Sequence, residues 1–186
     1  MATVGGNIVN ASPAADVVPV LLALDATVTC VGLQGERSLL IEEFASAPGV
    51  TARRPGELLT CASFPGPSPH SATAFLKAGR RRAMEISLVC VAVRLTLDTS
   101  RERCLDARIA LGAVAPTTLR ALAAERSLQG GRSATRFWPR PVARRPARMP
   151  ADHGRPGVGA SPRPAGGDAL VPRALARCRE RIQRAA

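Results

Sequence analysis

Residues 86–114, ISLVCVAVRLTLDTSRERCLDARIALGAV, give the clearest structural pattern in the chain. The first part, residues 86–97, is rich in valine and leucine, and its second half alternates as a half-buried strand does. The alternating apolar residues there are Val91, Val93, Leu95 and Leu97. Residues 108–114 alternate in the same way, and the polar residues 98–106 between the two runs predict a hairpin. We therefore expect two antiparallel strands at this place.

Shorter patterns extend this picture toward both ends. Further strands are expected at residues 26–31, 38–41, 58–64 and 72–76. Ser12 followed by Pro13 is a favourable helix start, because a hydroxyl can cap the first N–H groups and proline is tolerated at the first helical position. A buried helix is therefore expected over 14–24, and a second helix over 116–128. Strands and helices interspersed with short turns predict the α+β class.

Charge and proline are distributed unevenly along the chain. Residues 1–130 hold 13 Lys/Arg and 11 Asp/Glu, whereas residues 131–186 hold 13 Arg and 3 Asp/Glu. Half of the sixteen prolines also follow residue 130. Prolines at this density cannot lie in a helix interior, so residues 131–167 are expected to be disordered unless they have a different origin from the rest of the chain.

Several kinds of site are not indicated by the sequence. The longest apolar run, residues 17–24, is far shorter than the roughly 20 residues of a membrane span. No Lys or Arg precedes it, so it does not resemble a secretory signal. The five cysteines are too scattered for a zinc or iron–sulfur site, and buried thiols in a reducing cytoplasm are expected instead. We expect no metal ligands and no catalytic nucleophile or base.

A glycine motif, Thr3-Val4-Gly5-Gly6-Asn7, opens the chain. A pyrophosphate needs several backbone N–H donors converging on its oxygens, and glycines permit that close approach. Thr3 adds a hydroxyl donor, and Asn7 can bond either a cofactor or its own turn. The Gly-Gly pair alone indicates a tight turn before a helix more strongly than a cofactor site. The cofactor interpretation is favoured only when the sequence blocks that follow the motif are considered with it.

Four blocks occur in one order: TVGGNI continuing to residue 26, RPGELLT at 54–60, FLKAGRR with ISLV within 75–89, and ARIALGAVAPT at 107–117. Together they resemble the FAD-binding (medium) subunit of the molybdenum hydroxylases, the class of xanthine dehydrogenase and aerobic carbon monoxide dehydrogenase. The resemblance implies a partial FAD-binding PCMH-type second subdomain at residues 1–70. It also implies the start of a CO dehydrogenase flavoprotein C-terminal domain, antiparallel strands plus helices, at 71–130, with an approximate boundary.

The resemblance further implies which residues hold FAD. Asp16 would accept a hydrogen bond from a polar part of FAD, or would only favour the helix dipole as a charge in the first turn. Leu59 would contact the isoalloxazine from a core strand. Lys77, the only lysine, would stabilise negative charge on the reduced ring, or would be a solvated residue at a strand end. The complete implied set is Thr3, Val4, Gly5, Gly6, Asn7, Asp16, Leu59 and Lys77.

The implied function is electron transfer within a molybdenum-containing hydroxylase or dehydrogenase. An iron–sulfur small subunit and a molybdopterin large subunit would be partners, carrying the 2Fe-2S clusters and molybdopterin, and NAD or a quinone would be the acceptor. One alternative is a family fragment that binds no FAD alone. Another is a nucleic-acid-binding protein that uses the Arg-rich tail, with Phe137 and Trp138 stacking on bases.

Two features depart from the family pattern. The family places another glycine-rich subdomain before the Thr3 block, so we expect an N-terminally truncated chain. Arginine outnumbers lysine 25 to 1, which suggests a GC-rich gene. When residues 130–143 and 151–160 are back-translated with one permitted choice of GC-rich codons, a shifted reading frame gives family-like segments. We therefore expect residues 130–167 to be an out-of-frame translation, followed by a C-terminal helix at 168–186.

Overall fold

The structure, a computed structural model, describes residues 3–79, 86–131, 170–174 and 176–178. The expectations for the Arg/Pro-rich segment, including the shifted reading frame and the stacking pair Phe137 and Trp138, lie outside these residues. The described parts form antiparallel sheets with helices, so the α+β class is confirmed.

The first sheet has three antiparallel strands in the order β2-β1-β5. Two helices precede it, and three short elements lie between β2 and β5, two of which pair as a small separate ladder. The bounds are α1 Val4–Val9, α2 Val17–Ala23, β1 Thr27–Gly32, β2 Gly35–Leu40, α3 Ile41–Phe44, β3 Ala45–Ala47, β4 Val50–Thr51 and β5 Leu58–Ser63.

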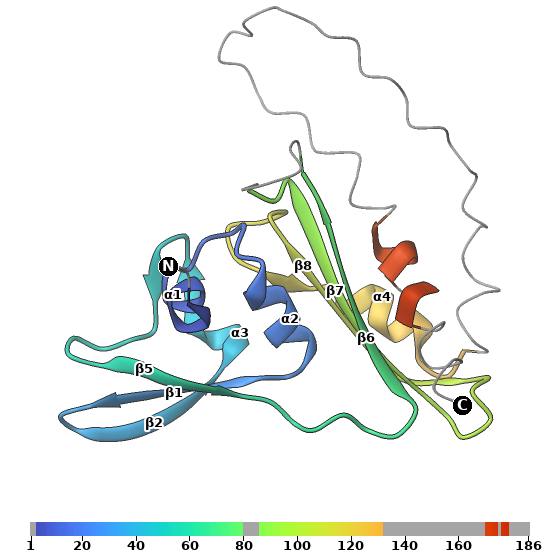
Figure 1. Ribbon diagram of the computed structural model, residues 1–186, viewed down its shortest axis with the longest axis horizontal. Coiled ribbons are helices and arrows are strands. Elements are labelled where there is room, and N and C mark those ends of the chain that lie inside the picture. Colours follow the sequence, from blue (N-terminus) through green and yellow to red (C-terminus); the bar gives the residue numbers. More distant parts are fainter. Residues whose placement is uncertain (1–2, 80–85, 132–169, 175, 179–186) are drawn as a thin grey trace, which may run out of the picture.

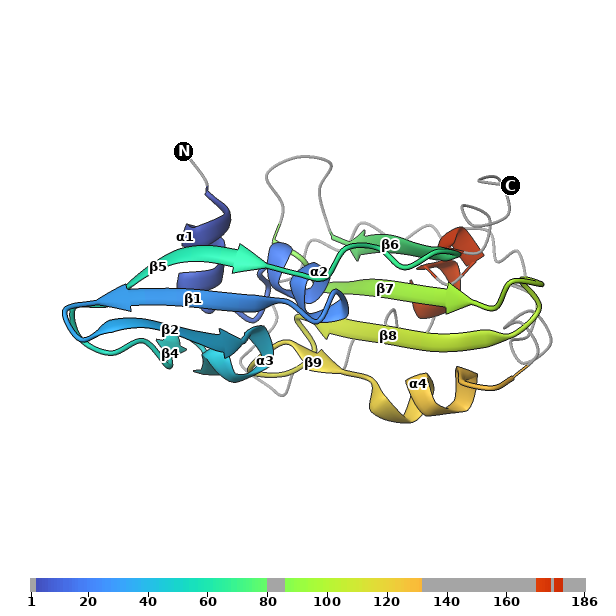
Figure 2. The ribbon, with the colours of Figure 1, turned by 90° about the horizontal axis from the view of Figure 1, so that it is seen from below.

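The second sheet has four antiparallel strands in the order β6-β7-β8-β9. Its bounds are β6 Ser71–Ala78, β7 Val89–Leu97, β8 Cys104–Gly112 and β9 Leu119–Arg120, followed by α4 Leu122–Leu128. The expected hairpin is present, because β7 and β8 pair along nearly their whole length. The two sheets lie at opposite ends of the long axis, as Figure 2 shows.

The second sheet is covered on both faces. The alternating residues of β7 that include Val91 and Val93 pack toward α4 and the helical residues 170–174 and 176–178, where Cys178 is fully buried. Ala92 and Ala110 face the other way and pack against α2 (Figure 1). The alternation in the sequence therefore sorts side chains between two cores, one on each face of the sheet.

Three elements differ from the sequence-based expectation. The glycine motif is the first turn of a helix rather than a turn, because the Thr3 hydroxyl caps it and Ile8 is buried. Helix α2 begins at Val17 instead of near residue 13, since Ser12 uses its hydroxyl to accept the Ala14 N–H in a separate turn. The expected helix 116–128 is shorter, because residues 119–120 pair with β8 as strand β9.

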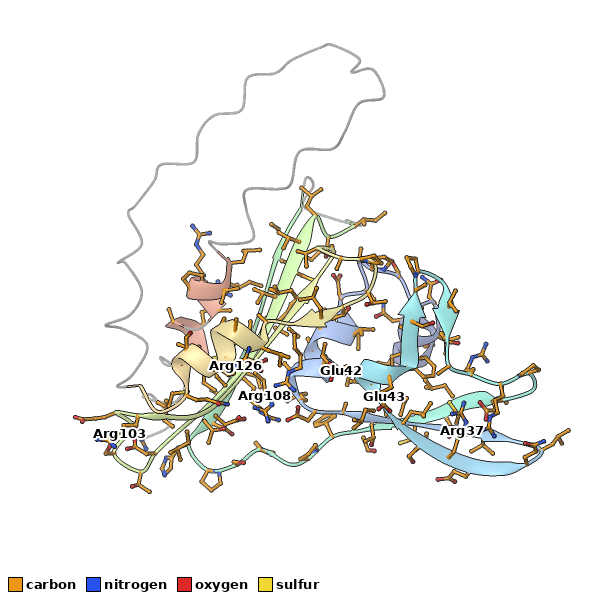
Figure 3. The ribbon with its side chains drawn as sticks, turned by 180° about the vertical axis from the view of Figure 1, so that it is seen from behind. Arg37, Glu42, Glu43, Arg103, Arg108 and Arg126 are labelled. Carbon is orange, nitrogen blue, oxygen red and sulfur yellow. The ribbon has the colours of Figure 1, made fainter. Side chains whose placement is uncertain are left out.

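An ionic network connects the end of α2 to the second sheet. Its members are Asp25, Arg94, Asp106, Arg108, Arg120 and Glu125. Asp25 lies at its centre, with Oδ2 2.6 Å from Arg94 Nη2 and Oδ1 3.7 Å from Arg120 Nη1. Figure 3 labels Arg108, which lies where the second sheet meets the first part of the chain. Ion pairs between Asp25, which follows α2, and arginines of the second sheet thus hold the N-terminal part of the chain on that sheet.

Candidate functional site

The glycine motif forms the N-terminal turn of α1. Thr3 Oγ1 accepts the Gly6 N–H at 3.0 Å, which makes Thr3 the N-cap. A Cβ at Gly6 would lie 2.9 Å from that hydroxyl, so a side chain there would disturb the cap. The other N–H groups of a first turn have no acceptor within the helix, and Val4 is exposed beside them. The turn therefore offers backbone donors on an open surface.

Strand β5 supports this turn from behind. A Cβ at Gly5 would lie 3.6 Å from Leu59 Cδ2, an ordinary contact distance. Leu59 is partly buried and packs against the core that contains Ile8. Leu59 is thus a core strand residue that also lines the glycine motif. Its expected contact with the isoalloxazine stays a prediction.

Asn7 makes a contact that the sequence did not indicate. Its Oδ1 accepts the Val17 N–H at 3.3 Å, so it links the start of α2 to α1. The alternative in which Asn7 bonds its own turn is wrong for the amide oxygen. The second lone pair of this oxygen and the two N–H donors of the amide leave Asn7 able to contact a cofactor, so that expectation stays a prediction.

Asp16 and Lys77 are brought together from distant parts of the sequence. Asp16 occupies the N-cap position of α2, yet its side chain makes no capping hydrogen bond. Its Oδ2 lies 2.6 Å from Lys77 Nζ on β6, and its Oδ1 accepts the Ser87 hydroxyl at 2.5 Å. The expectation of a solvated Lys77 is therefore wrong, because this lysine is in an ion pair.

Ser87 is a site residue that sequence patterns did not indicate. It is only 4% exposed, although its apolar neighbours Ile86 and Leu88 are 79% and 42% exposed. Such an inverted pattern, polar inside and apolar outside, cannot be recognised from sequence alternation, because it requires knowledge of which face is buried.

The cysteines near the site are protected thiols. Burial raises the pKa of the Cys90 thiol, and the negative charge of Asp16 raises it further. A thiol with a raised pKa is a poor nucleophile at neutral pH. Within the described residues, no group of three or more His, Cys, Asp or Glu side chains could hold a metal ion. None of the described helices is long and apolar enough to cross a membrane.

A cleft of about 310 Å³ lies between α2 and the β6–β7 edge. Phe75, two residues before Lys77, is among its lining residues, which are Val20, Ala23, Leu24, Thr73, Ala74, Phe75, Ala92, Val93 and Arg177. The ion pair and an open, partly apolar cleft therefore lie along the same edge strand. The eight residues implied by the resemblance fall into two groups, the glycine motif with Leu59 and the Asp16–Lys77 pair, which the Asn7–Val17 hydrogen bond connects.

Two family models match the chain in sequence order. The FAD binding domain in molybdopterin dehydrogenase matches residues 1–67, and the CO dehydrogenase flavoprotein C-terminal domain matches residues 74–138. The chain belongs to the FAD-binding medium subunits of the molybdenum hydroxylases.

Curated relatives and solved structures agree with this assignment. The putative xanthine dehydrogenase FAD-binding subunit of Escherichia coli is 34% identical over 130 residues, which are 69% of this chain and 44% of that protein. The carbon monoxide dehydrogenase medium chain of Afipia carboxidovorans is 33% identical over 130 residues, 70% of this chain and 44% of that one. A chain of reconstituted CO dehydrogenase from Oligotropha carboxidovorans superposes with a TM-score of 0.66 at 32% identity, covering 70% of this chain and 44% of that one. The chain spans less than half the length of these relatives.

The described residues fit a flavin dinucleotide. A side chain at Gly6 would collide with the capping hydroxyl of Thr3, and the exposure of Val4 shows that the first turn of α1 faces solvent. Lys77 is held in place by the Asp16 carboxylate. Backbone donors suit a pyrophosphate, and a fixed cation suits a ring that gains negative charge on reduction.

Proposed function

We propose that this chain binds FAD and serves in the electron-transfer subunit of a molybdenum-containing hydroxylase or dehydrogenase. The observation that carries the proposal is the Lys77–Asp16 ion pair, which joins the two family-matched regions and holds the only lysine at a defined point. FAD, when bound, supplies the redox chemistry, and the chain positions it and adjusts its electrostatics.

Each part of the site has a separate task. The first turn of α1, with Thr3, Val4, Gly5, Gly6 and Asn7, binds the pyrophosphate through its remaining backbone N–H groups, those of Val4 and Gly5, because Thr3 already accepts the N–H groups of Gly6 and Asn7. Leu59 supports that turn from β5 and provides an apolar contact for the ring system. These tasks need no proton transfer by the protein.

The Asp16 carboxylate has capacity for the cofactor as well as for Lys77. A carboxylate accepts about four hydrogen bonds, and the Lys77 ammonium and the Ser87 hydroxyl take one position on each oxygen. The remaining positions accept a donor from FAD. Lys77 then lies beside the ring and stabilises negative charge on it.

The complete enzyme extends beyond this chain. We propose that electrons come from an iron–sulfur small subunit, that a molybdopterin large subunit oxidises the substrate, and that NAD or a quinone is the acceptor. The relatives with FAD-subunit and medium-chain names support this arrangement. Four of the five free cysteines are buried, which favours a reducing, cytoplasmic location. The family matches also favour a domain boundary near residue 70.

The test is FAD retention by the purified chain. Protein mixed with FAD and desalted should keep the flavin absorbance bands. Lys77→Met, which preserves length and removes charge, should bind reduced FAD more weakly by roughly tenfold, which corresponds to about 1.4 kcal/mol, while Lys77→Arg should retain most of the binding. A colourless wild-type protein would refute FAD binding by this chain alone and favour a fragment that needs the rest of the subunit.

A further inference from the structure

We propose that Ser87 is a positioning residue of this site, which holds the Asp16 carboxylate so that Lys77 is fixed beside the flavin. No contact between Ser87 and the cofactor is needed for this role. The role of Ser87 at the flavin rests on the proposed function, but the first test, which measures the positioning of Lys77, requires no FAD.

The burial pattern around Ser87 indicates that its hydroxyl has a specific use. In the run Ile86-Ser87-Leu88 the polar side chain is buried and both apolar neighbours are exposed. Folding alone favours the opposite arrangement, because burying a hydroxyl is unfavourable unless it forms a hydrogen bond. The Ser87 hydroxyl donates to Asp16 Oδ1 at 2.5 Å, and it also forms a hydrogen bond with the Cys90 thiol.

The two oxygens of Asp16 are divided between two partners. Oδ1 accepts the Ser87 hydroxyl and Oδ2 contacts the Lys77 ammonium at 2.6 Å. The Asp16 side chain is 42% exposed, so water competes for both oxygens. A hydrogen bond from a buried hydroxyl restrains rotation of the carboxylate, and this restraint passes to the flexible lysine.

The strand register explains how Ser87 reaches this point. Lys77 on β6 pairs with Cys90 on β7, three residues after Ser87. The backbone N–H of Leu88 also donates to the Ala78 carbonyl at 3.0 Å, which ties the segment before β7 to the end of β6. Ser87 and Lys77 are thereby on adjacent chain segments that both meet the start of α2.

Because Lys77 is the only lysine, its reactivity can be measured without interference from other lysines. Acetylation of the full chain with an N-hydroxysuccinimide ester, followed by peptide mass spectrometry, gives the rate at Lys77 separately from the N-terminal amine. Ser87→Ala should raise that rate roughly 3- to 10-fold, the factor by which one partly exposed hydrogen bond shifts a local equilibrium. Ser87→Thr retains a hydroxyl and should restore most of the protection.

Asp16→Asn provides the reference for this experiment. If Ser87 acts through Asp16, then the acetylation rate at Lys77 should be the same in the Asp16→Asn single variant and in the Asp16→Asn/Ser87→Ala double variant. Alkylation of the exposed thiol of Cys61 on β5 should stay unchanged, which separates positioning from general loosening of the fold. If Ser87→Ala lowers thermal stability, then Ser87→Cys, similar in shape and a weak donor, replaces it. The proposal would be overturned if the acetylation rate at Lys77 were unchanged in a folded Ser87→Ala protein, or if the effects of Ser87→Ala and Asp16→Asn on that rate were additive in the double variant.

A second measurement connects Ser87 to the cofactor. The affinity ratio of reduced to oxidised FAD should fall several-fold in Ser87→Ala, because a less localised cation favours the charged reduced ring less. An unchanged ratio in a protein that binds FAD would overturn the role at the flavin. If the wild-type chain binds no FAD, the proposed function of the isolated chain fails, and the acetylation result still decides whether Ser87 positions Lys77.

Discussion

Gly112→Ala tests whether the close approach of α2 to the second sheet sets the geometry of the site. Gly112 is the last residue of β8. A Cβ there would lie 2.6 Å from Cys90 Sγ and 2.9 Å from Pro19 Cγ. Comfortable contacts between such atoms are about 3.5–4.0 Å, so one methyl group would require movements of roughly 1 Å on two sides.

The expected cost follows from the rigidity of these neighbours. Cys90 and Pro19 are both fully buried, and neither has a flexible end that could move aside. Overpacking of this kind costs about 1–3 kcal/mol. For a folded region of this size, thermal unfolding followed by circular dichroism should show a decrease in Tm of roughly 3–12 °C.

A second substitution identifies the clash. Cys90→Ala alone removes one buried atom and should cost about 1 kcal/mol. In the double variant the Cys90 overlap is gone, so the combined loss of stability should be clearly smaller than the sum of the two single losses. A Gly112→Ala protein within about 0.5 kcal/mol of wild type, or strict additivity in the double variant, would refute the reasoning about α2.

Three further changes test other contacts. Asp25→Asn removes the central charge of the ionic network and keeps a residue that tolerates the positive φ at this position. The free energy of unfolding measured in urea should fall by about 1–2 kcal/mol, and the fall should be smaller in high salt. An unchanged urea midpoint would contradict this role of Asp25. Glu125→Ala leaves the buried Ile109 N–H without its acceptor and should cost about 3–5 kcal/mol, with Glu125→Gln as the milder control. Hydrogen bonds from Arg37 hold the pKa of Glu57 at about 2, below its ordinary 4.5, so the stability from this pair is complete above about pH 4.5 and is lost as pH falls toward 2. Glu57→Gln should lack this acid-dependent loss, and parallel pH curves for the two proteins would argue against it.

Local patterns in the sequence were sufficient for the regular strands. The β7–β8 hairpin was expected because apolar residues that alternate along two nearby runs fit the period of a strand and not that of a helix. The glycine motif was expected as a turn because two glycines disfavour helix by about 1 kcal/mol each. The cap at Thr3 and the burial of Ile8 outweigh that preference, and both depend on the folded environment.

The sequence predicted Asp16 and Lys77 as candidate site residues, but it predicted neither their contacts nor the participation of Ser87. Lys77 was conspicuous as the only lysine, and Asp16 as a charge at a helix start. Their mutual ion pair joins residues 61 positions apart, and the Ser87 bond spans 71. No local periodicity encodes such pairs, because they arise from the packing of α2 on β7 and β8 of the second sheet.

Helix α2 therefore connects the packing of the fold to the proposed FAD site. Its N-terminal end receives the Asn7 oxygen from α1 and presents Asp16 to Lys77, while Pro19, one turn later, packs over Gly112. A displacement of α2 by roughly 1 Å, the movement that the Gly112 methyl group requires, would be felt at both halves of the site, because the glycine motif and Lys77 are joined through this helix. Hence Gly112→Ala should weaken FAD retention even though Gly112 belongs to neither half. Adding Cys90→Ala lets the new methyl group move away from Pro19 into the space left by the sulfur, and should therefore recover part of the retention together with part of the stability. Recovery of stability without recovery of flavin would instead separate the packing of α2 from the geometry of the site.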